Sequence, residues 1–113
     1  MYLHRVIIFS PQPDVLAAFY CRAFGMRILS VEGSFVDIGP ADSPTSRIAF
    51  HKGKRSPGTS IKLCFHSADV AAERERLMDL GIQMGKVQGT AESLCFCDGQ
   101  DAEGNAFQIT NRA

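Results

Sequence analysis

Two stretches of the chain repeat one pattern, and this repeat decides the fold. Asp14-Val15-Leu16-Ala17-Ala18 leads to Phe24-Gly25-Met26, and Asp69-Val70-Ala71-Ala72 leads to Leu80-Gly81-Ile82. Each copy follows an apolar run and reads as a helix start, an amphipathic helix and a glycine stop. The two aspartates are 55 residues apart (69 minus 14), so the copies fill almost the whole chain. The repeat predicts two half-domains that pair into one pseudo-symmetric sheet, with a site between them.

The composition fits one small domain. A chain of 113 residues with 45% hydrophobic residues can bury one core, and a second domain does not fit. The 12 basic and 12 acidic residues cancel, which argues against nucleic acids and anionic membranes as partners. No apolar run is long enough to span a membrane or follows a basic region as in a leader peptide. We therefore expect a cytoplasmic protein that binds a small molecule or another protein.

The first half of the chain predicts a βαβββ module over about residues 1–52. A β-rich run covers residues 3–9, and Ser10 followed by Pro11 predicts that a helix begins there and ends near Phe24. Three further strands are predicted from β-rich runs bounded by turn residues. They cover residues 26–31, 34–38 and 47–51.

A linker and a second βαβββ module follow. Residues 53–59 combine charge, proline and glycine between the two copies, so we interpret them as a linker, and the second module covers about residues 60–113. Residues 61–66 alternate as in a strand, and Asp69 predicts the N-cap of a helix that ends at Leu80. The last three strands are predicted at residues 82–87, 93–97 and 106–110. The predicted fold class is α+β, with two modules in one curved mixed sheet and helices on its convex face.

Three features resemble the vicinal oxygen chelate superfamily. They are His4 early in the first strand, the stretch from Phe19 to Gly25, and the terminal segment Asp101–Ile109, which resembles the pattern D-P-D-G-N-x-F-E-L. The superfamily includes glyoxalase I, bleomycin-resistance proteins, fosfomycin-resistance proteins and extradiol dioxygenases. The resemblance implies a single domain over residues 1–113, with a small-molecule site in the concave cup. It also implies a homodimer, in which the cup is completed within one chain or across the dimer.

The resemblance also implies positions for metal ligands. The metal enzymes of the superfamily take four ligands from the first and last strands of each module, and these positions fall at His4, Ala49, Lys62 and Gln108. Ala49 has no donor atom, and the ammonium group of Lys62 repels a dication. We therefore expect no divalent metal cofactor. A rearranged site of His4, His51 and Gln108 for Zn, Ni, Mn or Fe remains the alternative.

The alternation of strand side chains predicts which residues line the cup. Lys62 and Cys64 lie on the face opposite Leu63 and Phe65, and Gln108 lies opposite Phe107 and Ile109. Lys62 is either a solvated surface lysine or an anchor for an anionic group of a ligand. The sides of Asp37 and Glu92 stay open. The predicted ligand-binding residues are His4, Ala49, His51, Lys62, Cys64 and Gln108.

The cysteines lack the spacing of a zinc or redox motif. Cys21, Cys64, Cys95 and Cys97 form no CxxC pair, so we expect reduced thiols. If Leu94 and Phe96 face the core, Cys95 and Cys97 share the cup with Cys64. The alternative is that they are small, inert core residues.

Two functions remain open, and no catalytic residue is predicted for either. The first is a small-molecule-binding protein similar to bleomycin-resistance proteins, in which His4, Lys62 and Gln108 orient the ligand without a metal ion. The second is a metal-dependent lyase, isomerase or dioxygenase similar to glyoxalase I. The sequence alone leaves open whether the protein is an enzyme.

Overall fold

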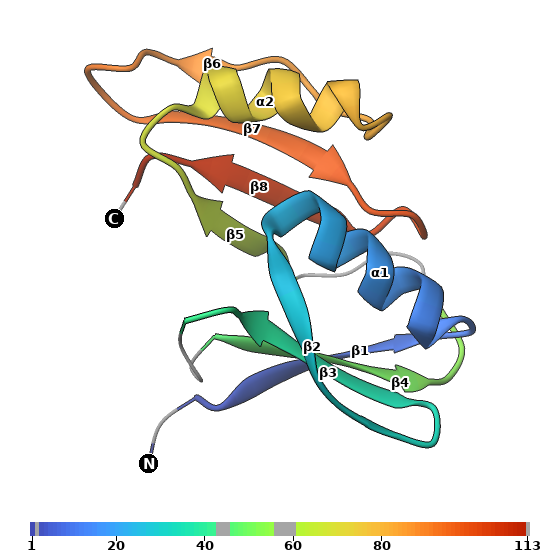
Figure 1. Cartoon of the computed structure of the whole chain (residues 1–113). Coiled ribbons are helices and arrows are strands. Elements are labelled where there is room, and N and C mark those ends of the chain that lie inside the picture. Colours follow the sequence, from blue (N-terminus) through green and yellow to red (C-terminus); the bar gives the residue numbers. More distant parts are fainter. Residues whose placement is uncertain (2, 43–45, 56–60, 113) are drawn as a thin grey trace. The chain divides into compact units, whose positions relative to one another are not determined.

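The computed structural model describes residues 1, 3–42, 46–55 and 61–112, and it divides into two compact units. We call Met1–Pro57 module 1 and Gly58–Ala113 module 2. Each module has the element order βαβββ, and a helix covers one face of each sheet (Figure 1). The predicted α+β class with two βαβββ modules is confirmed. Residues 56–59 of the predicted linker lie outside the described residues.

Module 1 contains a mixed four-stranded sheet in the order β1-β4-β3-β2. β1 is parallel to β4, whereas β3 is antiparallel to both β2 and β4. The elements are β1 (Arg5–Ser10), α1 (Pro13–Phe24), β2 (Met26–Glu32), β3 (Phe35–Pro40) and β4 (Arg47–Lys52).

Module 2 repeats this arrangement in the order β5-β8-β7-β6, with β5 parallel to β8. Its elements are β5 (Leu63–His66), α2 (Val70–Asp79), β6 (Gln88–Gly89), β7 (Cys95–Gln100) and β8 (Ala106–Thr110). The sequence predicted one sheet, but the strands of the described residues form two, because each strand pairs within its own module.

Helix α1 begins two residues later than predicted. Ser10 does not cap the helix, because its Oγ accepts a hydrogen bond from the backbone N–H of Gln12 at 2.9 Å and closes a local turn. Pro13 then occupies the first turn, where a missing N–H costs nothing. The helix ends at Gly25, whose left-handed φ of 64° is the conformation that the sequence predicted for a glycine stop.

Helix α2 has the ends that the sequence predicted. The Asp69 side chain accepts a hydrogen bond from the N–H of Ala72 at 3.0 Å, as an N-cap residue does. Leu80 is the C-cap, and Gly81 follows with a φ of 82°. Local capping chemistry therefore fixes both ends of this helix.

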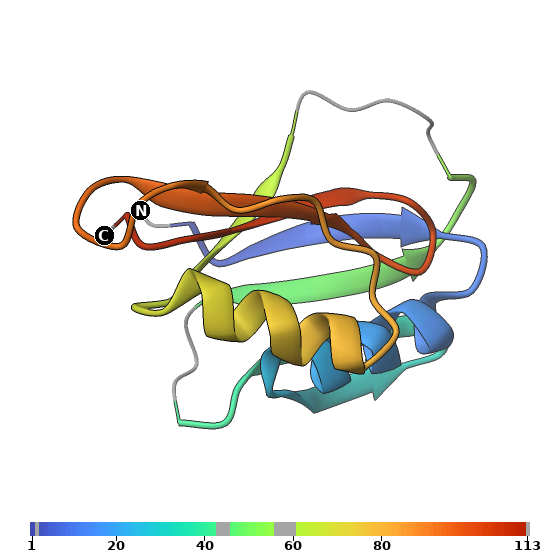
Figure 2. The same cartoon turned by 90° about the horizontal axis from the view of Figure 1, so that it is seen from above.

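One face of each sheet packs against its helix. In module 1 the buried aromatic side chains of Tyr20 and Phe50 meet with ring centroids 5.3 Å apart. In module 2 α2 packs on β7 and β8, where Leu77, Phe107 and Ile109 are buried (Figure 2). The opposite face of each sheet carries the polar residues discussed below, and we call it the open face.

Residues 82–87 do not form the predicted strand. The short strand β6 comes directly after them, at Gln88–Gly89. Met84 makes an isolated bridge with Gly99, and the N–H of Gly85 donates to the carbonyl of Asp98 at 2.7 Å. The carbonyl of Gly85 accepts a hydrogen bond from Nε of Arg74. Residues 83–85 are thus bonded to β7 at single points and do not form a continuous ladder with it.

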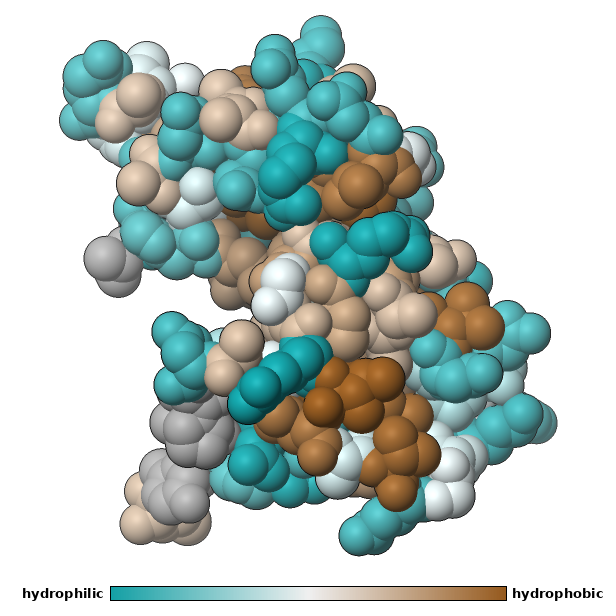
Figure 3. Space-filling model, viewed as in Figure 1, coloured by the Kyte–Doolittle hydropathy of each residue, from teal (hydrophilic) through white to brown (hydrophobic). Residues whose placement is uncertain are grey.

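Part of the apolar surface of module 1 remains exposed. Brown side chains gather at the surface of the module that carries α1 (Figure 3). Neither helix among the described residues is long and apolar enough to cross a membrane. The exposed large apolar residues of module 1 are Met1, Leu3, Ile7, Phe9, Val15, Ile28 and Val31.

Candidate functional site

The open face of module 2 brings three of the predicted residues together. Cys64 on β5 pairs with Gln108 on β8, and Gln108 pairs with Asp98 on β7. Neighbouring residues in register point to the same face of a sheet, so the side chains of Cys64, Gln108 and Asp98 form one row. Lys62 lies two residues before Cys64 and therefore belongs to the same face.

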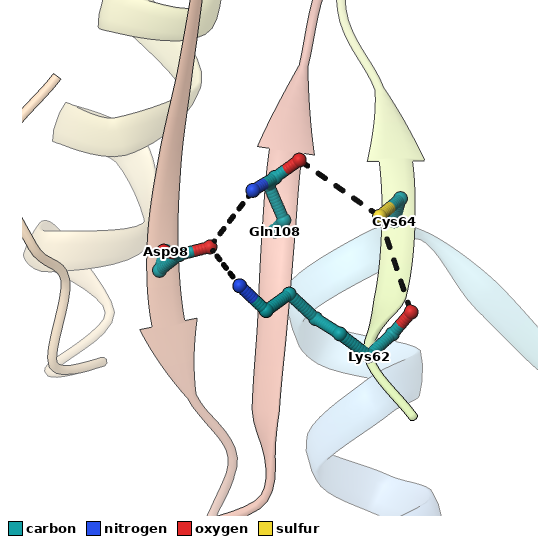
Figure 4. A network of polar contacts seen from close by, with 4 residues as sticks. All are labelled: Lys62, Cys64, Asp98 and Gln108. Atoms are coloured by element: carbon teal, nitrogen blue, oxygen red, sulfur yellow. Dashed lines mark hydrogen bonds and ion pairs between the residues drawn. The ribbon is translucent and has the colours of Figure 1, made fainter. Parts of the chain in front are cut away.

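Asp98 is the centre of a polar network on this face (Figure 4). Nζ of Lys62 and Nε2 of Gln108 each donate to Oδ1 of Asp98 at 3.0 Å. Sγ of Cys64 lies 3.9 Å from Oε1 of Gln108. The Lys62 and Asp98 side chains are 41% and 42% exposed, so solvent screens their ion pair and leaves both groups within reach of a ligand.

An open pocket of about 320 Å³ adjoins this network. It lies at the end of β7 and the start of β8, where the irregular segment around Met84 approaches Gly99. Lys62 and Asp98 belong to both the network and the pocket. The pocket is lined by Lys62, Gln83, Met84, Gly85, Asp98, Gly99, Gln100 and Ala106.

The sequence reasoning missed Asp98. It ended the strand at Cys97, whereas β7 continues to Gln100. Alternation was the signal in the sequence, but its phase was open because the sequence did not decide which side Cys97 faces. Cys97 is fully buried, so the next residue, Asp98, faces the opposite side beside Gln108.

The condition under which three thiols would share one cup is not met. Leu94 is exposed rather than part of the core, and both Cys95 and Cys97 are buried. Cys97 pairs in register with buried Ile109, which places it on the helix face, away from Cys64. Burial raises the pKa of the Cys97 thiol because desolvation disfavours the thiolate, so the alternative of inert core cysteines holds for this residue.

Native-state alkylation is expected to separate these thiols. Cys64 is exposed, whereas Cys97 is buried and its raised pKa keeps it in the less reactive thiol form. Iodoacetamide at neutral pH should label Cys64 before Cys97, which peptide mass spectrometry measures at successive times. Equal rates at both positions would contradict the assigned faces, and labelling in denaturant provides the control for intrinsic reactivity.

In module 1, two predicted histidines lie apart. His4 precedes β1, is exposed and accepts a hydrogen bond at Nδ1 from Nε of Arg5 at 3.2 Å. His51 pairs with Phe9 in register, and His4 lies five residues before Phe9, about 16 Å along an extended chain. Two imidazoles at that separation do not reach one metal ion.

Ala49 and Asp37 lie on the open face of module 1. Ala49 is buried and pairs with both Ile7 and Asp37. The sequence left the side of Asp37 open, and the structure shows it in contact with Arg5 and Arg47. Glu92 is exposed in the turn before β7.

The side chains at the four implied ligand positions do not fit a divalent metal ion. Ala49 offers no donor, and the ammonium of Lys62 is held by Asp98. The amide nitrogen of Gln108 also donates to Asp98. Among the residues that the structure describes, neither module gathers three His, Cys, Asp or Glu side chains as a metal-binding group requires.

Comparisons with known proteins identify the family. A glyoxalase-like domain model matches residues 5–110. No curated protein matches the sequence. The fold is similar to that of UcmS2, with a TM-score of 0.80 and 19% identity over 99% of this chain and 98% of that chain.

Two further solved structures with the same fold have different functions. The fosfomycin resistance protein FosX from Mesorhizobium loti has a TM-score of 0.77 and 14% identity, over 100% of this chain and 92% of that chain. A lactoylglutathione lyase from Agrobacterium tumefaciens has a TM-score of 0.72 and 15% identity, over 96% and 92%. The family model covers almost the whole chain, and the architecture agrees with it. The chain therefore belongs to the glyoxalase-like domain family within the vicinal oxygen chelate superfamily.

Proposed function

We propose that the protein binds a small organic molecule on the open face of module 2 and that this binding needs no divalent metal ion. The observation that carries the proposal is the Asp98 carboxylate, which is neutralised by Lys62 and hydrogen-bonded by Gln108 beside a pocket of about 320 Å³. The charge of this carboxylate is balanced by the ammonium group of Lys62, so the Lys62–Asp98 pair offers a ligand polar contacts rather than a free anionic group for a metal ion.

The lining of the pocket supports an amphipathic ligand. The ammonium of Lys62 has three donors, one of which bonds Asp98, and the amides of Gln83 and Gln100 both donate and accept. Met84 adds an adaptable apolar wall. A volume of about 320 Å³ lies at the lower end of ligand pockets, which suits a small ligand. Its affinity would come mainly from apolar burial, at about 25 cal/mol per Å² before the cost of association.

This role is similar to that of bleomycin-resistance proteins, which the sequence resemblance includes. A binding role without chemistry also fits a network in which Asp98, the carboxylate nearest the pocket, is already ion-paired. Its Oδ1 already accepts hydrogen bonds from both Lys62 and Gln108.

The test is a binding screen in the presence of a chelator. Protein purified without a histidine tag and treated with EDTA is titrated with small amphipathic compounds and followed by ¹H–¹⁵N NMR. Amide shifts are expected at Met84, Asp98 and Gln100. Lys62→Ala should weaken the best compound by about tenfold, because it removes the donor at the pocket edge.

Arg76→Ala is the matched control for the Lys62 variant. Arg76 forms an ion pair with Glu73 on α2 and is similarly exposed, but it does not line the pocket. This variant should bind as the wild type does.

Metal analysis tests the alternative function. The tag-free protein is dialysed against zinc, nickel, manganese or iron, and bound metal is measured by mass spectrometry. Stoichiometric retention that is lost in Gln108→Ala or His4→Ala would overturn the proposal in favour of a metal-dependent lyase, isomerase or dioxygenase.

A further inference from the structure

Strand β2 forms one edge of the sheet of module 1, and two of its apolar side chains are exposed. The strand order is β1-β4-β3-β2, so within this sheet β2 pairs with β3 on one side only. Ile28 is 56% exposed and Val31 is 57% exposed. An edge strand that exposes apolar side chains can pair with a strand of another chain.

A bulge in β2 changes which of its side chains share a face. Ser30 pairs with Asp37, and Leu29 before it is left out of the register between β2 and β3. Leu29 lies against Gly39, because its Cδ1 is 2.9 Å from the position that a Cβ at Gly39 would occupy. Gly39 is two residues from Asp37 on the same strand, so it shares the open face. Leu29 and Ser30 therefore both lie on the open face.

Because of this bulge, the faces of β2 follow the same order from either end. Arg27 and Glu32 pair with residues on the open face of β3, whereas Ile28 and Val31 pair with buried residues on its helix-covered face. The side chains of residues 27–32 thus follow the order open, helix, open, open, helix, open. Without the bulge, strict alternation would place Arg27 and Glu32 on opposite faces.

This order makes β2 complementary to itself in an antiparallel pair. A two-fold axis between residues 29 and 30 brings Arg27 opposite Glu32 of a second copy. The same axis brings Ile28 opposite Val31 of that copy. Opposite residues then share a face at every position, as antiparallel pairing of two sheets requires.

The charges and the apolar side chains also match in this register. Arg27 and Glu32 are exposed, and among the residues that the structure describes neither has an ion-pair partner. Two pairs of opposite charge form across the axis on the open face, and Ile28 and Val31 cover each other on the other face. Opposite charges and apolar side chains that lie directly across two strands stabilise the pair.

We propose that two copies of the chain associate through β2 in this register and join their module 1 sheets into one continuous sheet. The sequence resemblance implies a homodimer without naming a surface, and this inference names the strand, the register and the residues that pair. It does not depend on the ligand site of module 2. Only residues 27–32 of each copy pair, so the interface is small and the association is expected to be weak, in the micromolar range.

The first test is sedimentation equilibrium at protein concentrations from about 10 µM to 1 mM. Wild-type protein should show a reversible monomer–dimer equilibrium over this range. Added salt should weaken the dimer, because the pairs between Arg27 and Glu32 are exposed to solvent and are screened.

Exchange of the two charges tests the register. Arg27→Glu places two carboxylates opposite each other in both symmetry-related pairs, and Glu32→Arg places two guanidinium groups there. Each single variant should self-associate at least about tenfold more weakly than wild type. A mixture of the two variants should form a heterodimer, because each copy supplies the charge that the other lacks. Native mass spectrometry distinguishes this heterodimer from both homodimers by mass. The double variant Arg27→Glu/Glu32→Arg should dimerise as the wild type does.

Val31→Lys tests the apolar contact, because a charge on an edge strand opposes pairing. Val15→Lys is its matched control, since Val15 is 51% exposed but lies on α1. Lys54→Glu controls for the change in net charge, since Lys54 is exposed and follows β4 rather than β2. Both controls should self-associate as the wild type does. Far-UV circular dichroism checks that each variant is folded.

Four results would overturn the inference. Wild-type protein could remain monomeric over the whole concentration range, or Arg27→Glu and Val31→Lys could dimerise as strongly as the wild type. The mixed single variants could form no heterodimer. Association could also be lost in Val15→Lys as much as in Val31→Lys, which would move the interface to α1. None of these results decides whether module 2 binds a ligand.

Discussion

Replacing Phe50 with alanine is expected to lower the free energy of unfolding by about 3–5 kcal/mol. Phe50 is fully buried on β4, and its ring packs 5.3 Å from that of Tyr20 on α1. The substitution removes apolar burial and leaves a cavity that the surrounding sheet and helix fill only in part. Urea unfolding followed by far-UV circular dichroism measures the loss.

Phe9→Ala is the control for this prediction. Phe9 belongs to the same sheet but is 55% exposed on the open face. Its loss should cost less than about 1 kcal/mol, as for most substitutions at exposed positions. Equal destabilisation by the two variants would contradict the assignment of the helix-covered face as the core of module 1.

Asp101→Ala is expected to cost about 2–3 kcal/mol, because it leaves donors in the turn between β7 and β8 without their acceptor. Asp101 is 6% exposed, and its Oδ1 accepts from the N–H groups of Glu103 and Asn105, both at 2.9 Å. Its Oδ2 accepts from Nδ2 of Asn105 at 2.8 Å. One carboxylate thus organises the terminal segment whose sequence resembles the superfamily pattern. The same unfolding measurement applies.

Two further variants sharpen this prediction. Asp101→Asn keeps the shape and one acceptor oxygen, so its loss should lie between wild type and Asp101→Ala. Asp79→Ala removes an exposed carboxylate at the end of α2 and should change stability by no more than about 0.5 kcal/mol. A loss for Asp101→Ala as small as that for Asp79→Ala would show that the turn does not depend on the carboxylate.

Local signals in the sequence predicted much of the fold. The glycine stops at Gly25 and Gly81 and the cap at Asp69 depend on residues close in sequence, so they could be read without tertiary contacts. The predicted start of α1 was wrong because the Ser10 hydroxyl accepts a hydrogen bond from the N–H of Gln12 in a turn, and this bond competes with capping. The strand predicted at residues 82–87 was wrong, since this segment meets β7 at an isolated bridge between Met84 and Gly99.

The candidate sites were predictable only in part. Alternation placed Lys62, Cys64 and Gln108 on one face, and the structure brings them together with a fourth residue, Asp98. The contact between Lys62 and Asp98 joins residues that are 36 positions apart in the chain. Alternation within one strand does not predict the register between strands that brings them together.

In module 1 the limits of sequence reasoning have a similar cause. Asp37 binds Arg5 and Arg47 because three strands align, and the sequence contains no local mark of this alignment. His4 and His51 share a residue type but not a location, because the parallel register of β1 and β4 separates them.

Each module forms its own sheet, with the strand pairing of the described residues closed inside it. The sequence repeat therefore also divides the molecule into two modules, each with its own hydrogen-bonded sheet. A substitution on the polar side of one module leaves the backbone ladder of the other intact. On the polar side of module 1 Asp37 contacts two guanidinium groups, whereas on that of module 2 Asp98 contacts one ammonium group. The polar chemistry of either module can thus be altered without breaking the hydrogen-bonded scaffold of the other.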